Sequence, residues 1–541
     1  MVTAYSAGFA LIIAVFAFLS ILLWQATPTG LDPIIGGFFV GLLVKNVPLG
    51  LAIGATLELM SLGLWNYGGA IVPDYFVGAL LGTAFAALTG GSQTAAIATG
   101  LAVAVPVALF FPQVDAFFWS VATFFIHKAD SYAEKHNDTG VGRMQLLGLM
   151  PWYITRSLLV FFAIWLGATP IQRLITSIPS WLTAGLMTMA IILPALGFGI
   201  LLTYLPIQKW WAFFIVGFAL FAYLHVPLLG VALIALACII IYASLAQQGK
   251  DGAESSDAAE IDAGVSTDII PSNVTHGDLV KAMWRHNFTL EFAWNWERMQ
   301  ALGFCWSIMP VLRKVYPNDD DYYAAIKRHL VFYNCNPCIG SPTIFGAVCA
   351  MEEHHQPEMA ESLKISLMGP FAGVGDTLQA VLWKPLLAVL AASLALQGNT
   401  ASVWIMAIGW TSMVWYVRFP GFWLGYRQGL NLIKQISSGF VGRFTEYVGM
   451  AALIVMGAFV PSILSGVTTK VQFAKTVLLD GKQIEQTIKL QDTFDKILPF
   501  LIPLALTFLV YWLLKKKHWT NVRVLALLIV LGILLGAFKI L

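Results

Sequence analysis

The stretch Met368 to Lys384, MGPFAGVGDTLQAVLWK, guides the interpretation of the whole chain. It is apolar, yet it contains Pro370, three glycines and the ionisable residues Asp376 and Lys384. Helix-breaking residues are tolerated at membrane depth where neighbouring protein or a wet cavity satisfies the freed backbone groups. A charge at that depth is costly and marks a functional site. We therefore expect a helix broken at Pro370 and Gly373 that lines a cavity, with Lys384 as an ion-pair partner of Asp376 or as a gate.

A second interrupted segment lies in the first half of the chain, at Gly54 to Asp74, GATLELMSLGLWNYGGAIVPD. Glu58, Asn66 and Asp74 recur in it at intervals of eight, which on a straight helix would rotate each by about 80° from the last. The intervening glycines and proline favour a bent path instead. Carboxylates and an amide suit the hydroxyls of a sugar, although a structural polar network between helices uses the same groups. One such segment in each half is typical of a transporter's substrate site.

The composition indicates a mainly helical, polytopic membrane protein. Of the 541 residues, 58% are hydrophobic and 11% are charged, against about 25% charged residues in soluble domains. Basic and acidic residues number 31 and 29, so no charge excess points to nucleic acid as a partner. Met1 to Trp24 is apolar without a basic start, which predicts an uncleaved first span.

Two hydrophobic blocks, residues 1–245 and 276–541, flank a polar, acidic segment at 246–275 that predicts a disordered linker. The chain therefore reads as two membrane subunits joined in one polypeptide. Residues 276–333 mix basic and aromatic side chains at helical spacing, which predicts an amphipathic cytoplasmic region lying at the membrane interface. Residues 469–490 alternate around Asp480-Gly481 and predict a small β-hairpin on the outer side of the membrane.

Asn334 and Asn336 lie in a further polar break, YNCNPCIGSP. Asn-Pro favours a turn. Their side-chain amides are equally suited to bond a ligand or to bond backbone groups that the break sets free. Both residues are therefore candidate substrate-binding residues.

Other groups that suggest catalysis or metal binding are assigned no role. Cys335 and Cys338 form a C-x-x-C without a second close pair, which argues against zinc. His354 and His355 are adjacent, so on a helix they would point in different directions, as in a solvated helix end. No Walker loop is present. We expect no metal, no cofactor and no catalytic residue in this chain.

The chain resembles the mannose-family sugar permeases of the bacterial phosphoenolpyruvate-dependent phosphotransferase system (PTS). The first half, with GATLELMSLGLWNYGGAIVPD, resembles the IIC subunit, and the second, with WERMQALGFCWSIMP, KRHLVFYN, MGPFAGVGDTLQ and the late hairpin, resembles IID. The resemblance implies two halves of related fold and inverted topology with broken or re-entrant helices, and an elevator-like movement. It also implies a homotrimeric assembly in the bacterial cytoplasmic (inner) membrane. The family's subunits are normally separate chains, whereas residues 246–275 join them here.

The resemblance further implies that a hexose crosses the membrane and is phosphorylated by a separate phosphorylated IIB (IIAB) protein, which we expect to dock on residues 276–333. Neither IIC nor IID carries a phosphorylated residue of its own in this family. The expected sugar site combines residues of both halves: Glu58, Asn66, Asp74, Asn334, Asn336 and Asp376.

Two other function classes are open to the same residues. In a proton-coupled secondary sugar transporter, Glu58 or Asp376 would carry the proton, and free sugar would accumulate in the cell. An intramembrane metalloenzyme would use the cysteines and histidines, and metal analysis would detect it.

Overall fold

The computed structural model describes residues 5–62, 72–89, 92–176, 181, 185, 188, 191–192, 194–248, 273–295, 297–429, 440–479, 482–519 and 521–541. The first half forms α1 (Ala7–Ala26), η1 (Pro28–Leu31), α2 (Pro33–Leu43), α3 (Val47–Ser61), α4 (Tyr75–Ala86), α5 (Gln93–Glu134), α6 (Asp138–Leu147), α7 (Met150–Thr176), α9 (Pro194–Tyr204), α10 (Ile207–Ala222) and α11 (Leu228–Gln248). The second half forms α12 (His276–Thr289), α13 (Ala301–Val315), α14 (Asp319–His329), α15 (Gly340–Glu353), α16 (Pro357–Asp376), η3 (Thr377–Trp383), α17 (Lys384–Leu396), α18 (Ala401–Trp404), η4 (Ile405–Trp410), α19 (Thr411–Gln428), α21 (Phe440–Ile463), β1 (Gln472–Leu479), β2 (Lys482–Lys489), α22 (Leu490–Ile497), α23 (Leu501–Lys515) and α24 (Asn521–Ala537). The predicted linker falls almost entirely outside the described residues.

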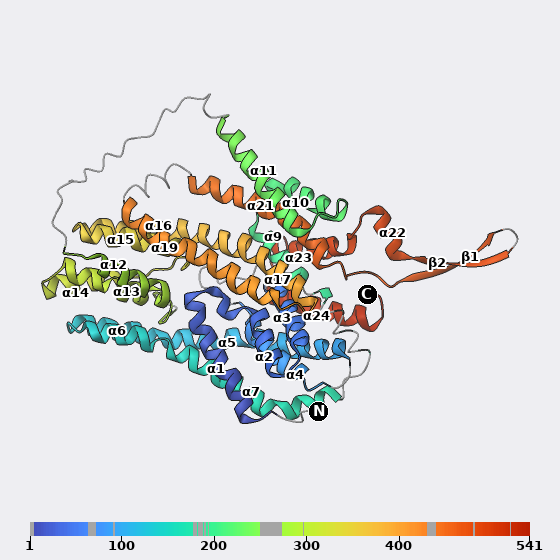
Figure 1. The fold of residues 1–541 in the computed structure, drawn as a ribbon, viewed down its shortest axis with the longest axis horizontal. Helices are drawn as coiled ribbons and strands as arrows, with labels where there is room; N and C mark the ends of the chain where they lie inside the picture. Colours follow the sequence, from blue (N-terminus) through green and yellow to red (C-terminus); the bar gives the residue numbers. More distant parts are fainter. Residues whose placement is uncertain are drawn as a thin grey trace.

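The two halves interlock. Helices α1 to α7 lie side by side, whereas α9, α10 and α11 lie among α21 and α23 of the second half (Figure 1). In the same way α17 of the second half packs on α3 of the first. One hydrophobic core therefore contains buried side chains from both halves, such as Leu57, Ala391 and Phe459.

Several helices are long and apolar enough to cross a membrane. Among the described residues these are Ala7–Ala26, Gln93–Phe111, Asp138–Gly167 and Phe371–Leu396. A fifth candidate is the pair Leu490–Ile497 and Leu501–Lys515, which is bent by 75° and is either a broken span or a re-entrant loop. The chain is a multi-pass, mainly helical membrane protein.

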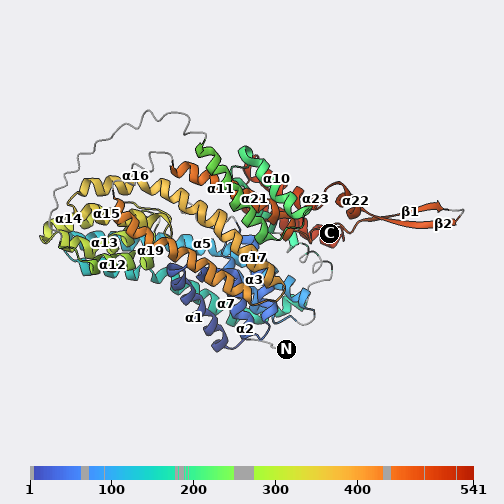
Figure 2. The same ribbon diagram turned by 45° about the horizontal axis from the view of Figure 1, so that its top comes forward.

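The segment Met368 to Lys384 is not broken where the sequence predicts. Helix α16 continues through Pro370 and Gly373 to Asp376 and runs on into α17 (Figure 2). The irregular part is η3, a π-helical stretch that joins α16 to α17. Because a π-helix bonds i to i+5, its turns are wider, and such turns are frequent at functional sites. The prediction of a break at Pro370 and Gly373 was therefore wrong. The irregular backbone is the π-helical stretch that begins at Thr377, a few residues later.

The amphipathic region predicted at the membrane interface is covered by protein. Helices α12, α13 and α14 bury their apolar faces against one another and against the end of α5, where Ile126 and Ala129 join the same core as Leu279 and Phe304. This cluster holds apolar side chains that an isolated amphipathic helix would place in lipid. The apolar faces of these helices are covered by α5 and α6 of the first half, and the place of the region at the membrane interface stays a prediction.

Strands β1 and β2 pair antiparallel from Gln472 with Lys489 to Leu479 with Lys482, in the segment where the sequence predicts a hairpin. The predicted turn, Asp480-Gly481, lies outside the described residues. The two strands extend away from the helices at the end of the molecule opposite α12 to α14 (Figures 1 and 2).

Candidate functional site

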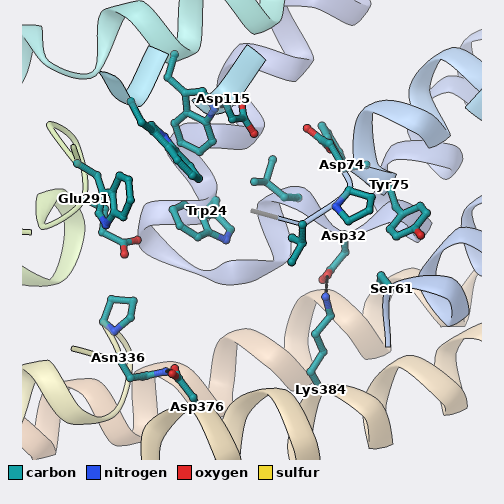
Figure 3. A pocket seen from close by; sticks show the side chains of 18 of the residues that line it. Trp24, Asp32, Ser61, Asp74, Tyr75, Asp115, Glu291, Asn336, Asp376 and Lys384 are labelled. Atoms are coloured by element: carbon teal, nitrogen blue, oxygen red, sulfur yellow. Dashed lines mark hydrogen bonds and ion pairs between the residues drawn. The ribbon is translucent and has the colours of Figure 1, made fainter. Parts of the chain in front are cut away.

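A cavity of about 260 Å³ lies between the two halves of the chain (Figure 3). One water needs only roughly 10–15 Å³ on such a measure, so the cavity has room for a ligand of monosaccharide size. Asp74, Asn334, Asn336, Asp376 and Lys384, five of the residues singled out from sequence, line it. The other lining residues are Trp24, Leu31, Asp32, Pro33, Ser61, Val72, Pro73, Tyr75, Phe76, Asp115, Trp119, Trp152, Arg156, Glu291, Trp294, Gln300, Cys335, Pro337, Ala372 and Trp410.

Asp74 is positioned by the start of α4. Its Oδ1 accepts a hydrogen bond of 3.0 Å from the Val77 amide, as an N-cap residue does. Its carboxylate also forms an ion pair with Arg156 of α7, and both side chains are buried. The Arg156 guanidinium turns inward and compensates this buried carboxylate.

Lys384 bridges the two halves of the chain. Its Nζ lies 3.7 Å from Asp32 Oδ1 and 3.8 Å from Glu58 Oε1. The sequence predicts Asp376 as its partner, but these ion pairs reach acids of the first half. Glu58 is fully buried behind the cavity wall, and it is connected to the cavity through Lys384.

Asn336 holds Asp376 in place. Its Nδ2 donates to Asp376 Oδ1 at 2.8 Å and to Gln379 Oε1 at 2.9 Å. Its Oδ1 accepts from the amides of Cys338 and Ile339. These bonds use the donors and acceptors of one side-chain amide, so this asparagine bonds backbone and the neighbouring carboxylate at once. A Cβ at Gly375 would lie 2.6 Å from Asn336 Cγ, which explains why glycine precedes Asp376.

Asn334 and Asn66 complete the six predicted sugar-site residues. Asn334 lines the cavity, and its backbone amide contacts Met368 Sδ at 3.4 Å. Asn66 lies outside the described residues.

Sequence reasoning assigned no role to two further acids of the cavity, Asp115 and Glu291. Trp152 Nε1 donates to Asp115 Oδ1 at 2.6 Å, and Gln300 Nε2 donates to Glu291 Oε1 at 3.0 Å. Asp115 is the one formal charge between Asp74 and His127. That isolation in an apolar run is a signal that identifies it. Glu291 lies among other charged residues in the segment 276–333, so its charge does not stand out in the sequence.

Tryptophan side chains form much of the cavity wall. The rings of Trp119 and Trp294, one from each half, lie 4.6 Å apart between centroids. Trp24 and Trp152 meet edge to face at 6.1 Å. Trp152 lines this cavity and also donates a hydrogen bond to Asp115. Such rings provide apolar faces beside the carboxylates.

The cysteines and the histidine pair were considered in the sequence as possible metal ligands. Cys335 and Cys338 are buried free thiols. His354 and His355 are exposed at the C-terminal end of α15. Over the described ranges, no group of three or more His, Cys, Asp or Glu side chains is placed to hold a metal ion.

Comparisons with known proteins divide the chain in the same way as its composition. Residues 273–541 match the family described as the PTS system mannose/fructose/sorbose family IID component, and residues 7–241 match the PTS system sorbose-specific IIC component.

Individual relatives agree with these matches. The chain is 34% identical over 259 residues to the mannose-specific EIID component of Escherichia coli K12, covering 45% of this chain and 87% of the relative. It is 34% identical to the fructose permease IID component of Bacillus subtilis 168, covering 45% and 89%. It is 30% identical to N-acetylgalactosamine permease IIC component 1 of Escherichia coli K12, covering 36% and 71%. The chain therefore belongs to the mannose/fructose/sorbose family of PTS sugar permeases, with a IIC component followed by a IID component in a single polypeptide.

Proposed function

We propose that this chain carries a hexose across the bacterial cytoplasmic membrane through the cavity between its two halves. The observation that supports this most directly is that both components contribute residues to the wall of the cavity. Asp74 and Asp32 come from the IIC region, whereas Asn334, Asp376 and Lys384 come from the IID region. A site built in this way forms only when both components are present, and a relative movement of the halves would change it.

The carboxylates of Asp74 and Asp376 would accept hydrogen bonds from sugar hydroxyls, with Asn334 as a further polar contact. Glu58 has both carboxylate oxygens buried, and Lys384, whose Nζ is 3.8 Å from Glu58 Oε1, lies between it and the cavity. We assign Lys384 the role of a gate, and Glu58 the role of holding the Lys384 side chain in position. Asn336 acts as a positioning residue through Asp376. Asn66 remains a predicted sugar contact.

A phosphorylated IIB (IIAB) protein would complete the reaction on the cytoplasmic side. The phosphoryl group would leave the IIB side chain and bond to a sugar hydroxyl, whose proton passes to water. Residues 276–333 are the proposed docking surface, which puts the β-hairpin at the opposite, outer face. Inverted topology of the halves, an elevator-like movement and a trimeric assembly belong to the same proposal.

The substitution Asp376→Asn tests the placement of the site. We expect hexose affinity to fall roughly 10- to 100-fold, because a hydrogen bond to a charged acceptor contributes about 1.5–3 kcal/mol. Uptake and binding would be measured with labelled mannose, fructose and sorbose. Asp492→Asn is the matched control, since that side chain is exposed on α22, outside both the cavity and the proposed docking surface.

If uptake and binding are unchanged in Asp376→Asn, Asp376 is not a sugar-binding residue. The chemical form of the accumulated sugar tests the coupling separately. Sugar phosphate inside the cell, dependent on IIB, supports the proposal. Free sugar driven by a pH gradient would favour proton cotransport instead.

A further inference from the structure

The charges around the cavity are unbalanced. Five acidic side chains line it, Asp32, Asp74, Asp115, Glu291 and Asp376, against two basic ones, Arg156 and Lys384. The undescribed segment next to Asp74, residues 63–71, contains no charged residue. A cavity intended for an anion would be expected to show the opposite balance.

Both basic side chains of the lining are already paired with acids. Arg156 is bound to Asp74, and Lys384 lies between Asp32 and Glu58. A third cation, Arg418, reaches a small adjoining cavity that Glu291 also lines. Its guanidinium donates to the carbonyl oxygens of Gln25 and Asn287 at 3.0 and 2.6 Å, so its hydrogen bonds serve the ends of α1 and α12, while its charge also acts on Glu291.

Asp115 and Glu291 are fixed by neutral donors. The indole of Trp152 bonds Asp115 and the amide of Gln300 bonds Glu291. A neutral donor holds a carboxylate in one orientation without cancelling its charge. The two acids come from different components, α5 of the IIC region and the segment after α12 of the IID region, and in Figure 3 they lie on two sides of Trp24.

We propose that Asp115 and Glu291 are specificity-determining residues that admit a neutral hexose and reject its phosphorylated product. This inference rests on the proposed sugar transport. A phosphate ester carries a charge of about −1.5 to −2 at pH 7, and repulsion between like charges is strong where water is largely excluded. Protonation of some acids weakens the repulsion, but it supplies no cation. The product therefore leaves the cavity and does not re-enter it, which makes transport one-way.

Competition binding to the purified full-length chain tests this proposal. The labelled probe is whichever of mannose, fructose and sorbose binds most tightly. The competitors are its 6-phosphate (or the 1-phosphate, for fructose or sorbose) and the neutral dimethyl ester of the same phosphate, which has the same core shape without the charge. We expect the phosphate to compete at least about 100-fold more weakly than the neutral ester, the scale of repulsion from buried like charges.

In the double variant Asp115→Asn/Glu291→Gln, the difference in competition between the phosphate and the neutral ester should shrink at least about tenfold, because two of the repelling charges are removed. The charge-conserving variant Asp115→Glu/Glu291→Asp should keep most of the gap, which separates charge from shape. Asp492→Asn, on the exposed surface of α22 and outside both the cavity and the proposed docking surface, should leave the ratio as in the unmodified chain.

Equal competition by phosphate and ester in the unmodified chain would overturn the inference and leave sugar transport standing. A ratio that does not change in Asp115→Asn/Glu291→Gln would overturn the assignment to these two residues. If no hexose binds at all, the proposed transport function fails first, and this inference falls with it.

Discussion

The ion pair between Asp74 and Arg156 shows how a single residue is fixed by its surroundings. Asp74 caps α4, lines the cavity and binds a guanidinium that is 2% exposed. Removing one member of a buried pair leaves an uncompensated charge, which typically costs 3–5 kcal/mol. The pair therefore holds α4 and α7 together at the place where sugar is proposed to bind.

We predict that Arg156→Gln alone lowers stability by about 3–5 kcal/mol, while Asp74→Asn/Arg156→Gln recovers part of the loss because no lone charge stays buried. Thermal unfolding of the purified variants would measure both. The exposed pair Arg313 and Asp319, 2.6 Å apart, is the control, and breaking it should cost at most about 1 kcal/mol. If the single and double variants lose the same amount of stability, a lone buried charge is not the cause of the loss.

At the scale of secondary-structure elements, a buried cluster joins α13, α14 and α15. Glu352 accepts hydrogen bonds from Arg328 at 2.9 Å, from His329 Nε2 at 2.9 Å and from the Tyr316 hydroxyl at 2.8 Å. Burial by itself raises the pKa of Glu352, but the bond from His329 and the charge of Arg328 outweigh it and lower the pKa to about 2. The carboxylate is thus the charged centre around which these three helices pack.

This lowered pKa predicts acid sensitivity with a definite sign. An unfolded glutamate has a pKa of 4.5, so the stabilisation is complete above that pH and is lost as the pH falls towards 2. Its size is about 3 kcal/mol. We expect the unfolding temperature to fall between pH 5 and pH 3, and to fall less steeply in Glu352→Gln. Asp492→Asn, on α22, should follow the unmodified chain. If the unfolding temperature of Glu352→Gln falls as steeply as that of the unmodified chain, Glu352 is not the source of the acid sensitivity.

At the scale of the whole molecule, the two components are held together by contacts that do not involve the linker. Arg298 of the IID region forms two hydrogen bonds with Asp130 of the IIC region, at 2.9 and 2.8 Å. Helices α10 and α21 cross so closely that a Cβ at Gly457 would lie 2.7 Å from the Phe218 amide nitrogen. Small residues permit such close approach of helices in membranes.

We therefore predict that cutting the linker leaves the two components associated. A protease site placed between residues 249 and 272, cleaved after purification, should give two fragments that still elute together. Gly457→Ala should weaken their association, because its methyl group forces α10 and α21 apart. Gly369→Ala is the matched control, since nothing lies within 4 Å of a Cβ there. Separation of the fragments without any substitution would show that the linker holds the halves together.

The amino-acid sequence by itself determined the class of protein and identified acidic residues of both halves that line one cavity. Charged residues in apolar segments are expensive, so Asp74 and Asp376 stood out without any structure, and both line the same cavity. Composition likewise separated the IIC and IID regions, and alternation around Asp480-Gly481 located the two strands.

The tertiary structure alone decided which charged side chains meet. Lys384 pairs with Asp32 and Glu58, more than 300 positions away in the chain, and Arg156 of α7 turns into the cavity and pairs with Asp74. Periodicity and propensity describe neighbours within a few residues, whereas these pairs arise from how α3, α7 and α17 pack. Glu291 became visible as part of the site for the same reason, because only the folded chain brings its segment against the cavity.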